Sequence, residues 1–386
     1  MDKVIQEYCI GCGLCQGLGK AELSCNQKGY LYPVDGDEKW LRAVCPGGGT
    51  QCTSMDFNHI WGRSEAVYYG YSIDESLRKK ASSGGALTEI AAYLLENKKV
   101  DAILHTCASS KNPTETEICI STSREELVSR CGSRYAISHP LSSISILDAN
   151  KKYAFIGKPC DVTVLKNFQK MNPAISEIIP ITMSFFCAGL PSIDAQKKLL
   201  KEMGCDGRVV SLRYRGNGWP GYATATQEDG KQFQMDYNTS WGKILGRDIM
   251  KMCRFCLDGI GEMADIACCD AWYLTEDNKP DFTEADGRNG IFCRSKLGVE
   301  IVREASTNGK LAVTEFVDYE EKLKYMQFYQ HDRRATMLTK YAAMKICLKP
   351  FPKYPMKVRK YQKGVGIRRC LRIFKGTVGR VLKGKI

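Results

Sequence analysis

The chain has 386 residues, of which 56 are Lys or Arg and 43 are Asp or Glu, so its formal net charge is +13. An apolar content of 44% is enough to build a core, which excludes a protein that is disordered as a whole. The charge is uneven, because residues 349–386 hold 13 Lys and Arg and no acidic residue. Residues 1–348 are therefore formally neutral, and we expect no nucleic-acid partner for them.

The 19 cysteines are the second unusual feature of the composition. The chain is long and its first residues hold no apolar segment typical of a signal peptide, so a secreted disulfide scaffold is not expected. No apolar run approaches the ~20 residues that span a bilayer, and the longest candidate, residues 179–190, is typical of a buried strand. We expect a reducing, cytoplasmic compartment, where clustered cysteines indicate metal or redox chemistry.

In chain order, residues 1–62 are rich in Cys and Gly without clear periodicity, which predicts a loop-dominated module. Alternating apolar segments then predict strands over residues 100–107, 153–157, 178–187, 209–214, 264–269, 290–294 and 311–317. Predicted helices cover residues 87–95, 162–170, 195–203, 297–305 and 319–343. The alternation favours an α/β fold, a mixed sheet covered by helices, and three prolines at 350–355 predict a linker into a basic tail.

Three cysteines, Cys9, Cys12 and Cys15, follow one another at intervals of three residues. This spacing lets three thiolates turn inward around an iron–sulfur cubane. Gly11 and Gly13 let the loop fold tightly and point backbone N–H groups at the sulfur atoms. A zinc knuckle is the alternative, but zinc sites prefer pairs of ligands to a triplet.

The fourth ligand of this site must come from further along the chain. A two-cluster ferredoxin has another cysteine four residues after the triplet, and that position is Gly19. Cys45, which precedes a proline as cluster cysteines often do, is the best candidate, and Cys25 and Cys52 are its rivals.

Four further cysteines suggest a second site. Cys160 and Cys187 each follow a predicted strand, and Cys253 and Cys256 form a C-x-x-C pair. Because strand carboxyl ends meet at one edge of an α/β sheet, these thiols can converge there and bind a second cluster. The alternative is that Cys160 and Cys187 are buried small hydrophobic residues, and the spacing leaves both open.

The other cysteines show no such pattern. Cys268 and Cys269 are adjacent in a predicted strand and face opposite sides, so they are not expected to share a metal. The remaining cysteines are isolated in the sequence and expected to be structural: Cys107, Cys119, Cys131, Cys205, Cys293, Cys347 and Cys370.

Three glycine-rich turns could hold a cofactor. Residues 82–85, Ser-Ser-Gly-Gly, precede a predicted helix and offer hydroxyls and N–H groups suited to a phosphate, although a plain N-cap is the simpler interpretation. Residues 132–135 and 213–219 combine glycine with cations and aromatic rings, as in dinucleotide sites and in ordinary surface loops. The chain has no G-x-G-x-x-G, P-loop or nucleophile elbow and its four His lack spaced partners, so no catalytic residue is assigned.

The order of these segments is itself informative. They are the Cys9 triplet, Ser82-Ser83-Gly84-Gly85-Ala86, Gly132-Ser133-Arg134-Tyr135, Gly157-Lys158-Pro159-Cys160, Phe186-Cys187-Ala188-Gly189, the 214–219 turn, Cys253-x-x-Cys256 and residues 264–272. Over about residues 1–310 the chain resembles a bacterial member of the beta-subunit family of coenzyme F-420 hydrogenase and dehydrogenase. That family in turn resembles the plant hydroxymethyl-chlorophyll reductase.

The resemblance implies an oxidoreductase that passes electrons between one or two [4Fe-4S] clusters, FAD and a hydride-exchanging substrate. It implies cluster ligands at Cys9, Cys12, Cys15 and Cys45, and at Cys160, Cys187, Cys253 and Cys256. The implied FAD site comprises Ser82, Ser83, Gly84, Gly85, Ser133, Arg134, Tyr135, Arg215 and Asp270. We therefore expect a ferredoxin-like module over residues 1–62, a mixed-sheet flavin-binding domain over 63–346 and a basic tail over 347–386.

Partners and substrate follow less directly. The resemblance implies a redox partner protein or a reduced ferredoxin-type donor, and a small-molecule or sugar-linked substrate, because such proteins also occur in cell-surface polysaccharide metabolism. Cys269 and Lys158 depart from the family pattern beside the implied flavin site. The alternatives are an electron-relay subunit without its own substrate and a zinc-stabilised, non-enzymatic scaffold.

The tail has a helical pattern of its own. Apolar residues recur at helical spacing among cations, at Ile367, Leu371, Phe374, Val378, Val381 and Leu382. This predicts a basic amphipathic helix with peripheral contact at the inner face of a membrane. Five glycines in the tail each cost about 1 kcal/mol of helix stability, so a tail that is disordered until it meets a surface is the alternative.

Overall fold

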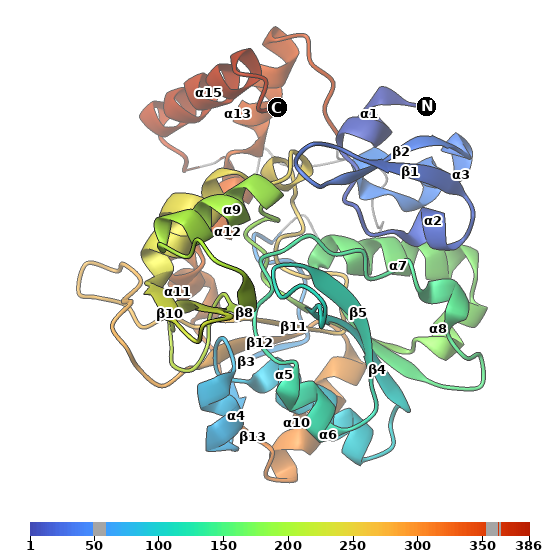
Figure 1. The fold of residues 1–386 in the computed structure, drawn as a ribbon, viewed down its shortest axis with the longest axis vertical. Helices are drawn as coiled ribbons and strands as arrows, with labels where there is room; N and C mark the ends of the chain where they lie inside the picture. The colour runs from blue at the N-terminus through green and yellow to red at the C-terminus, as the bar shows by residue number, and fades with distance from the viewer. Residues whose placement is uncertain (49–58, 353–361, 363) are drawn as a thin grey trace.

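Eight of the described strands form one mixed sheet at the centre of the computed structural model (Figure 1). The structure describes residues 1–48, 59–352, 362 and 364–386. The strand order is β13(Leu311–Glu315)-β3(Ala66–Ser72)-β12(Asn289–Cys293)-β11(Ile266–Asp270)-β7(Ile181–Phe185)-β6(Tyr153–Ile156)-β4(Ala102–Ala108)-β5(Thr116–Ser121). The four central strands β11, β7, β6 and β4 run parallel, and the outer pairs are antiparallel. The predicted mixed α/β sheet is therefore confirmed.

Helices cover both faces of this sheet. One face packs against α5(Ala86–Glu96) and α10(Lys296–Thr307), and the other packs against α7(Pro159–Met171) and α11(Tyr319–Met326). Within β11, Cys268 points into the α5 side and Cys269 into the α11 side. The prediction that these two cysteines face opposite sides is confirmed.

The predicted single helix over 319–343 is wrong. The structure contains three helices there, α11, α12(Phe328–Ala335) and α13(Met337–Ile346). The breaks fall at Gln327, whose side-chain amide donates to the carbonyl of Asp270 (2.7 Å), and at Thr336, whose hydroxyl donates to the carbonyl of Asp332 (2.7 Å). Each break redirects the chain so that the next helix follows the surface of the body.

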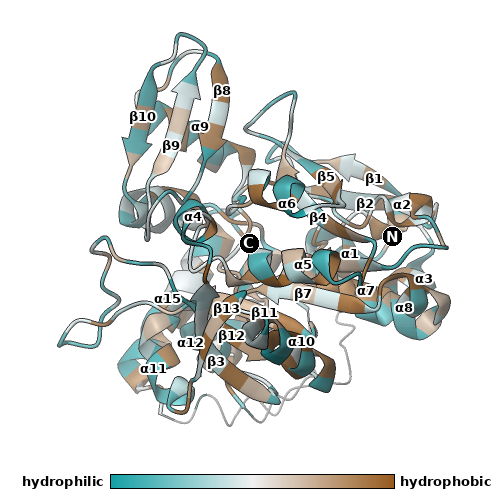
Figure 2. Ribbon diagram, turned by 90° about the horizontal axis from the view of Figure 1, so that it is seen from below, coloured by the Kyte–Doolittle hydropathy of each residue, from teal (hydrophilic) through white to brown (hydrophobic). Residues whose placement is uncertain are grey.

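A second, three-stranded sheet stands off from the large one (Figure 2). It consists of β8(Val209–Arg213), β9(Ala223–Gln227) and β10(Gln232–Met235), and α9(Ile193–Glu202) packs against it. Only β8 was predicted, because β9 and β10 are short and lie in a segment of mixed polarity, and half of the residues of β10 are exposed. Short helices complete the body: α4(Glu75–Lys80), α6(Arg124–Ser129) and α8(Ala174–Ile178).

The first 48 residues form more regular structure than predicted. They contain α1(Lys3–Glu7), α2(Leu14–Gly17), the hairpin β1(Ala21–Cys25)–β2(Leu31–Gly36) and α3(Glu38–Val44). This part lies beside α7 in Figure 1 and bonds to the body. Tyr30 donates its hydroxyl to the carbonyl of Leu190 (3.0 Å), and Asn167 donates to the carbonyl of Val44 (3.0 Å).

The tail folds into a helix. α15(Ile367–Leu382) contacts α13 and lies at one end of the molecule (Figure 1). The prediction of a helix is confirmed, and the alternative of a disordered tail is wrong for residues 364–386. Among the described residues, no helix combines the length and the apolar character needed to cross a membrane.

Candidate functional site

The structure gathers four of the predicted cluster ligands around one small cavity. Cys9, Cys12 and Cys15 approach it from the loop before α2, and Cys45 approaches from the end of α3. The loop turns on two glycines, Gly11 and Gly13, with φ of 67° and 82°, which side chains other than glycine rarely adopt. The backbone N–H of Gly11 donates to the sulfur of Cys9 (3.3 Å).

The two rival fourth ligands do not share this position. Cys25 is exposed at the end of β1 and does not line the cavity. Cys52 lies outside the described residues. Cys45 therefore completes the set in the described part of the chain.

The chemistry of these thiols fits a polynuclear metal site. Burial raises the pKa of Cys9 to about 12 and the pKa of Cys12 and Cys45 well above the ordinary thiol value, so thiolates are unfavourable there without a cation. A cysteine triplet at intervals of three residues, with a fourth cysteine at the same cavity, matches the ligand pattern of an iron–sulfur cluster better than the ligand pairs of a zinc site.

The second cysteine set also converges. Cys160 lies in the first turn of α7, Cys187 follows β7, and Cys253 and Cys256 lie in and after a 3₁₀ turn, η5(Met252–Arg254). Cys187 interacts electrostatically with both Cys253 and Cys256, and Cys160 interacts with Cys187 and Cys256. Burial raises the pKa of Cys256 to about 12, so these thiols are also neutral without a metal.

One buried arginine holds the backbone of this second set. The guanidinium of Arg333 in α12 donates to the carbonyls of Cys253 (2.9 Å), Cys187 (3.1 Å) and Ala188 (3.0 Å). Its charge also lowers the pKa of Cys187 and Cys256 against the effect of burial. The N–H of Leu190 donates to the sulfur of Cys253 (3.3 Å), a contact typical of cluster ligands.

The two cysteine sets lie on either side of the start of α7. Val164 in α7 lines the first cavity, and Asp161 interacts electrostatically with both Cys12 and Cys160. The backbone also holds the first set to the body, since the N–H of Leu141 donates to the carbonyl of Cys12 (3.0 Å).

A pocket of about 630 Å³ opens at the carboxyl ends of the four parallel strands. Residues from the ends of β4, β6, β7 and β11 line it, together with all nine predicted cofactor residues except Gly84. Such a volume at such an edge suits a large organic cofactor. Cys187 and Lys158 also line this pocket, so the second cysteine set adjoins it.

The turn at residues 82–85 is not a plain N-cap. Gly85 occupies the N-cap position of α5 with φ of 76° and no side-chain cap. Ser82 accepts from the N–H of Ser133 (2.7 Å), and Ser83 donates to the carbonyl of Arg288 (2.9 Å). Gly84 is required by close packing, because a Cβ there would lie 2.8 Å from the Cα of Arg288.

The predicted arginines have different surroundings. The guanidinium of Arg134 donates to the carbonyls of Leu212 (2.9 Å), Pro113 (2.7 Å) and Glu115 (2.9 Å), so Arg134 orders the pocket wall. Arg215 forms a bidentate pair with Asp270 (2.9 and 3.0 Å) and is only 3% exposed. Although burial opposes the charge, the carboxylate of Asp270 raises the pKa of Arg215.

An aromatic wall was not predicted from the sequence. Tyr237 and Trp272 stand beside the Arg215 guanidinium at 4.6 and 5.2 Å, and Tyr135 packs against Trp241 with ring centroids 4.6 Å apart. All four rings line the pocket. Tyr237 precedes and Trp241 lies within a short π-helix after β10, Asn238–Ile244, where neither periodicity nor a motif marks them.

Lys158 and Asp161 form a buried ion pair (2.8 Å) between the cysteines and the pocket, and this pair too was missed. Lys158 also donates to the hydroxyl of Ser138 (2.9 Å). Burial opposes its charge, but Asp161 raises the pKa of Lys158 and keeps a cation beside the second cysteine set. The spacing Lys-x-x-Asp around a Pro-Cys at a helix start is the signal that could have identified the pair.

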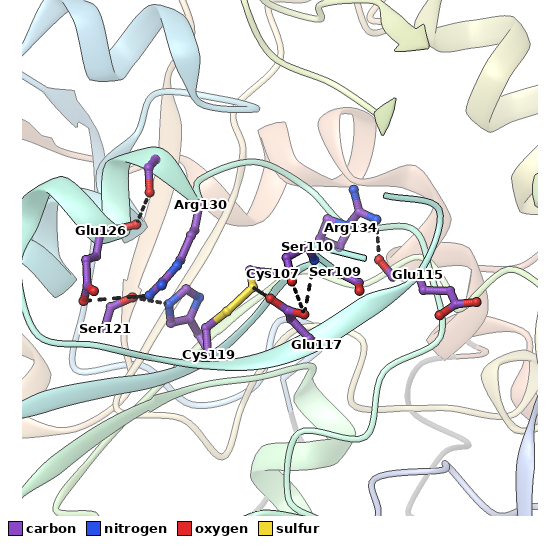
Figure 3. Close-up of a disulfide and its surroundings, with 12 residues drawn as sticks. Cys107, Ser109, Ser110, Glu115, Glu117, Cys119, Ser121, Glu126, Arg130 and Arg134 are labelled. Carbon is purple, nitrogen blue, oxygen red and sulfur yellow. Dashed lines mark hydrogen bonds and ion pairs between the residues drawn. A yellow bond between two sulfur atoms is a disulfide. The ribbon is translucent and has the colours of Figure 1, made fainter. Parts of the chain in front are cut away.

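Cys107 and Cys119, predicted to be isolated, are joined in a disulfide across β4 and β5 (Figure 3). The antiparallel pairing brings them together from positions twelve residues apart. On the same strand His105, which lines the pocket, bonds through Nε2 to the hydroxyl of Ser121 (2.8 Å). Burial lowers the pKa of His105 to about 4, so its imidazole is neutral at pH 7.

Comparison with known proteins agrees with this arrangement. Residues 67–145 match the N-terminal part, and residues 150–319 the C-terminal part, of the family described as coenzyme F420 hydrogenase/dehydrogenase, beta subunit. The chain belongs to this family. The family resemblance expected from the sequence is therefore confirmed, and with it an oxidoreductase subunit rather than a scaffold.

Individual relatives of this beta-subunit family are distant. The chain is 22% identical over 276 residues to coenzyme F420 hydrogenase subunit beta of Methanococcus voltae, covering 69% of this chain and 90% of the relative. The same subunit of Methanosarcina barkeri is 22% identical over 247 residues, covering 62% and 77%. A chain of the F420-reducing [NiFe] hydrogenase complex from Methanosarcina barkeri shares the fold, with a TM-score of 0.59 and 18% identity over 78% of this chain and 98% of that one.

The family match covers most of the large pocket and the whole second cysteine set, while the pocket residues 326–330 lie beyond it. The first cysteine set and α15 lie outside both matched ranges.

Proposed function

We propose that this beta-subunit family member is an iron–sulfur flavoprotein that exchanges electrons with a redox partner protein and hydride with a small-molecule substrate. The observation that carries the proposal is that three sites adjoin one another. Two four-cysteine sets lie on either side of the start of α7, and a pocket of about 630 Å³ lies beside the second set. Iron–sulfur clusters carry single electrons, and a flavin exchanges them for hydride.

The cysteine sets would each hold one [4Fe-4S] cluster. Cys9, Cys12, Cys15 and Cys45 offer four thiols around one cavity, three of them in a triplet that zinc sites seldom use, and the sulfur of Cys9 accepts from a backbone N–H. Cys160, Cys187, Cys253 and Cys256 offer four more, with their backbone held by Arg333. The cation of Lys158 offsets the negative charge that four thiolates bring to a buried place.

The large pocket would hold FAD. The turn at 82–85 lines the pocket with two serines and the start of α5, a place suited to phosphates, although the N–H of Ala86 donates to Asn289 (3.1 Å). The wall of Tyr135, Tyr237, Trp241 and Trp272 offers flat apolar surface for rings. The Arg215–Asp270 pair fixes this wall, because Trp219 donates its indole N–H to Asp270 (3.0 Å) and stacks on Trp272 with ring centroids 4.6 Å apart. Substrate would enter the same pocket, since its volume exceeds what one ring system fills.

Metal analysis of anaerobically prepared protein tests the two clusters. We expect iron and acid-labile sulfide without zinc, and loss of about half of the iron in Cys12→Ser and in Cys256→Ser. Cys205→Ser is the matched control, because Cys205 is buried in the α9 layer away from both sets. Zinc in the wild-type protein, or full iron content in both ligand variants, would contradict the proposal.

Release of the bound cofactor by acid tests the flavin. We expect FAD in the supernatant, and a raised melting temperature when FAD is added to stripped protein, worth about 2.7 kcal/mol at a hundredfold excess over Kd. Trp241→Ala should weaken this stabilisation, and Tyr222→Ala, an exposed ring outside the pocket, should leave it unchanged. The relatives are named for coenzyme F420, so that deazaflavin is the first substrate to assay. Electron uptake without reduction of any added substrate would instead favour the electron-relay alternative.

A further inference from the structure

The tail helix α15 packs onto the body with one face only. Thr377 and Val381, 1% and 9% exposed, lie on this face, and α13 is the helix that they approach. Arg369 pairs with Asp332 of α12 (2.7 Å), and Gln362 just before the helix donates to the hydroxyl of Thr339 (2.8 Å). These contacts fix the rotation of the helix, so its other faces have a defined direction.

A second apolar stripe of α15 remains uncovered by the body. Ile367, Leu371 and Leu382 are 79%, 54% and 81% exposed. At about 100° of rotation per residue, the three positions fall on one side of the helix, next to the packed face but not within it. Packing against α13 therefore uses only part of the apolar surface of α15.

Basic residues follow the outer edge of this stripe. Arg368, Arg372, Lys375 and Lys383 fall beyond it on the helical projection, and all four are exposed. None of them forms an ion pair with another described residue. Residues 349–386 contain no acidic side chain, so no local carboxylate neutralises this edge.

We propose that α15 is an interfacial helix that binds the surface of a bilayer containing anionic lipid. An apolar stripe bordered by cations matches the boundary between acyl chains and anionic headgroups, where both are satisfied at once. A nucleic acid or an acidic protein would be recognised by the cations but would leave Ile367, Leu371 and Leu382 in water. The helix lies at one end of the molecule (Figure 1).

Vesicle sedimentation of the full-length protein tests this proposal. The probes are vesicles of phosphatidylcholine alone and with about 30% phosphatidylglycerol, at ionic strengths of about 0.1 M and 0.5 M. We expect binding to the anionic vesicles only, weakened by salt. Point variants are preferable to truncation, because Val381 and Ile386 are part of the core that a truncation would open.

Two variants test the cations and the apolar stripe of α15 separately. The triple variant Arg368→Gln, Arg372→Gln, Lys375→Gln should lower the partition coefficient about a hundredfold, at about fivefold for each cation. The variant Leu371→Ser, Leu382→Ser should lower it at least tenfold and leave the salt dependence in place. The matched control changes three exposed cations elsewhere to Gln, at Arg208, Lys231 and Lys279.

Each result decides the proposal. Loss of binding in both α15 variants, with the control unchanged, supports it, provided that all variants keep the wild-type melting temperature. Equal binding to neutral and anionic vesicles, or equal loss in the control, overturns it. Binding to RNA or to an acidic protein that needs the cations but not Leu371 and Leu382 also overturns it and identifies a polyanion partner instead.

Discussion

At the scale of single residues, the buried charges of the pocket matter most. Arg215 and Asp270 are joined by two hydrogen bonds, and Asp270 also accepts from the indole of Trp219. Such a pair contributes little net stability when intact, but removing one member leaves the other charge buried without compensation. The pair therefore acts as an orienting device for the aromatic wall.

Removing the carboxylate charge tests this role. We expect Asp270→Asn to lower the free energy of unfolding by about 3–5 kcal/mol, because the guanidinium of Arg215 loses its counter-charge. Denaturant unfolding followed by tryptophan fluorescence would measure the loss, since Trp219 and Trp272 stack beside the pair. The control Asp277→Asn removes an exposed carboxylate, and a similar loss there would argue against a specific effect.

His105 gives the pocket a dependence on pH. Its folded-state pKa of about 4 lies below the ordinary value of 6.5, so the unfolded chain binds a proton first as the pH falls. The contribution of the neutral imidazole to the free energy of unfolding is therefore fully present above pH 6.5. It is lost progressively as the pH falls from 6.5 to 4. By linkage, this residue alone should cost about 2 kcal/mol between pH 8 and pH 5.

The variant His105→Gln isolates that contribution. We expect its unfolding free energy to fall by about 2 kcal/mol less than that of the wild-type protein between pH 8 and pH 5. The comparison uses the slope with pH and not the absolute stability, because the variant also alters the bond to Ser121. Parallel slopes for the two proteins would contradict the assignment.

At the scale of elements, the sequence was informative wherever burial produced a regular pattern. The central strands and α5, α7, α9 and α10 were predicted because each buries one face or both. The break at Gln327 was not, because it depends on a tertiary hydrogen bond to Asp270 that no local pattern encodes. The break at Thr336 involves a local bond to Asp332, and no glycine or proline marks it in the sequence.

The candidate site divides in the same way. Cysteine spacing predicted the first set of thiols, because cluster ligands recur at short, fixed intervals along the chain. Spacing left the second set open, and the family resemblance implied it. Tyr237 and Trp241 were missed, because side chains from separate segments meet only once the sheet has formed. Arg134 was predicted at the pocket, but its bonds to three carbonyls could not be read from a single glycine-rich turn.

The glycines of α15 are unfavourable for the helix that it forms. Gly376 and Gly379 lie within the helix, and a Cβ at Gly379 would meet no atom within 4 Å. We expect Gly379→Ala to stabilise the helix by about 0.5–1 kcal/mol, measured by slower amide exchange in residues 367–382. Gly84→Ala is the opposite case, because its Cβ would lie 2.8 Å from the backbone of Arg288, and it should destabilise the protein.

At the scale of the whole molecule, the body and the first 48 residues are stabilised in different ways. The body around the large sheet has continuous apolar cores on both faces. The first 48 residues have a much smaller core of their own, with Ile5, Cys15 and Leu41 at its centre, and three short helices and a hairpin around it. The same segment also packs Tyr8, Leu14, Tyr30 and Val44 into a core that it shares with the body, so we expect its folding energy to come from this docking together with metal binding by the four cysteines.

The variant Cys12→Ser tests this division. Structural metal sites in small modules supply folding energy on the order of 10 kcal/mol, so loss of one ligand should unfold the module while the body persists. In limited proteolysis of the anaerobic protein we expect rapid cleavage within residues 1–48, and a resistant fragment that begins after them. Cys25→Ser is the matched control, since Cys25 is exposed in the same module and does not line the cavity. The module also bonds to the body through Tyr30 and Val44, so a variant as resistant as the wild-type protein would show that docking, and not metal binding, holds it.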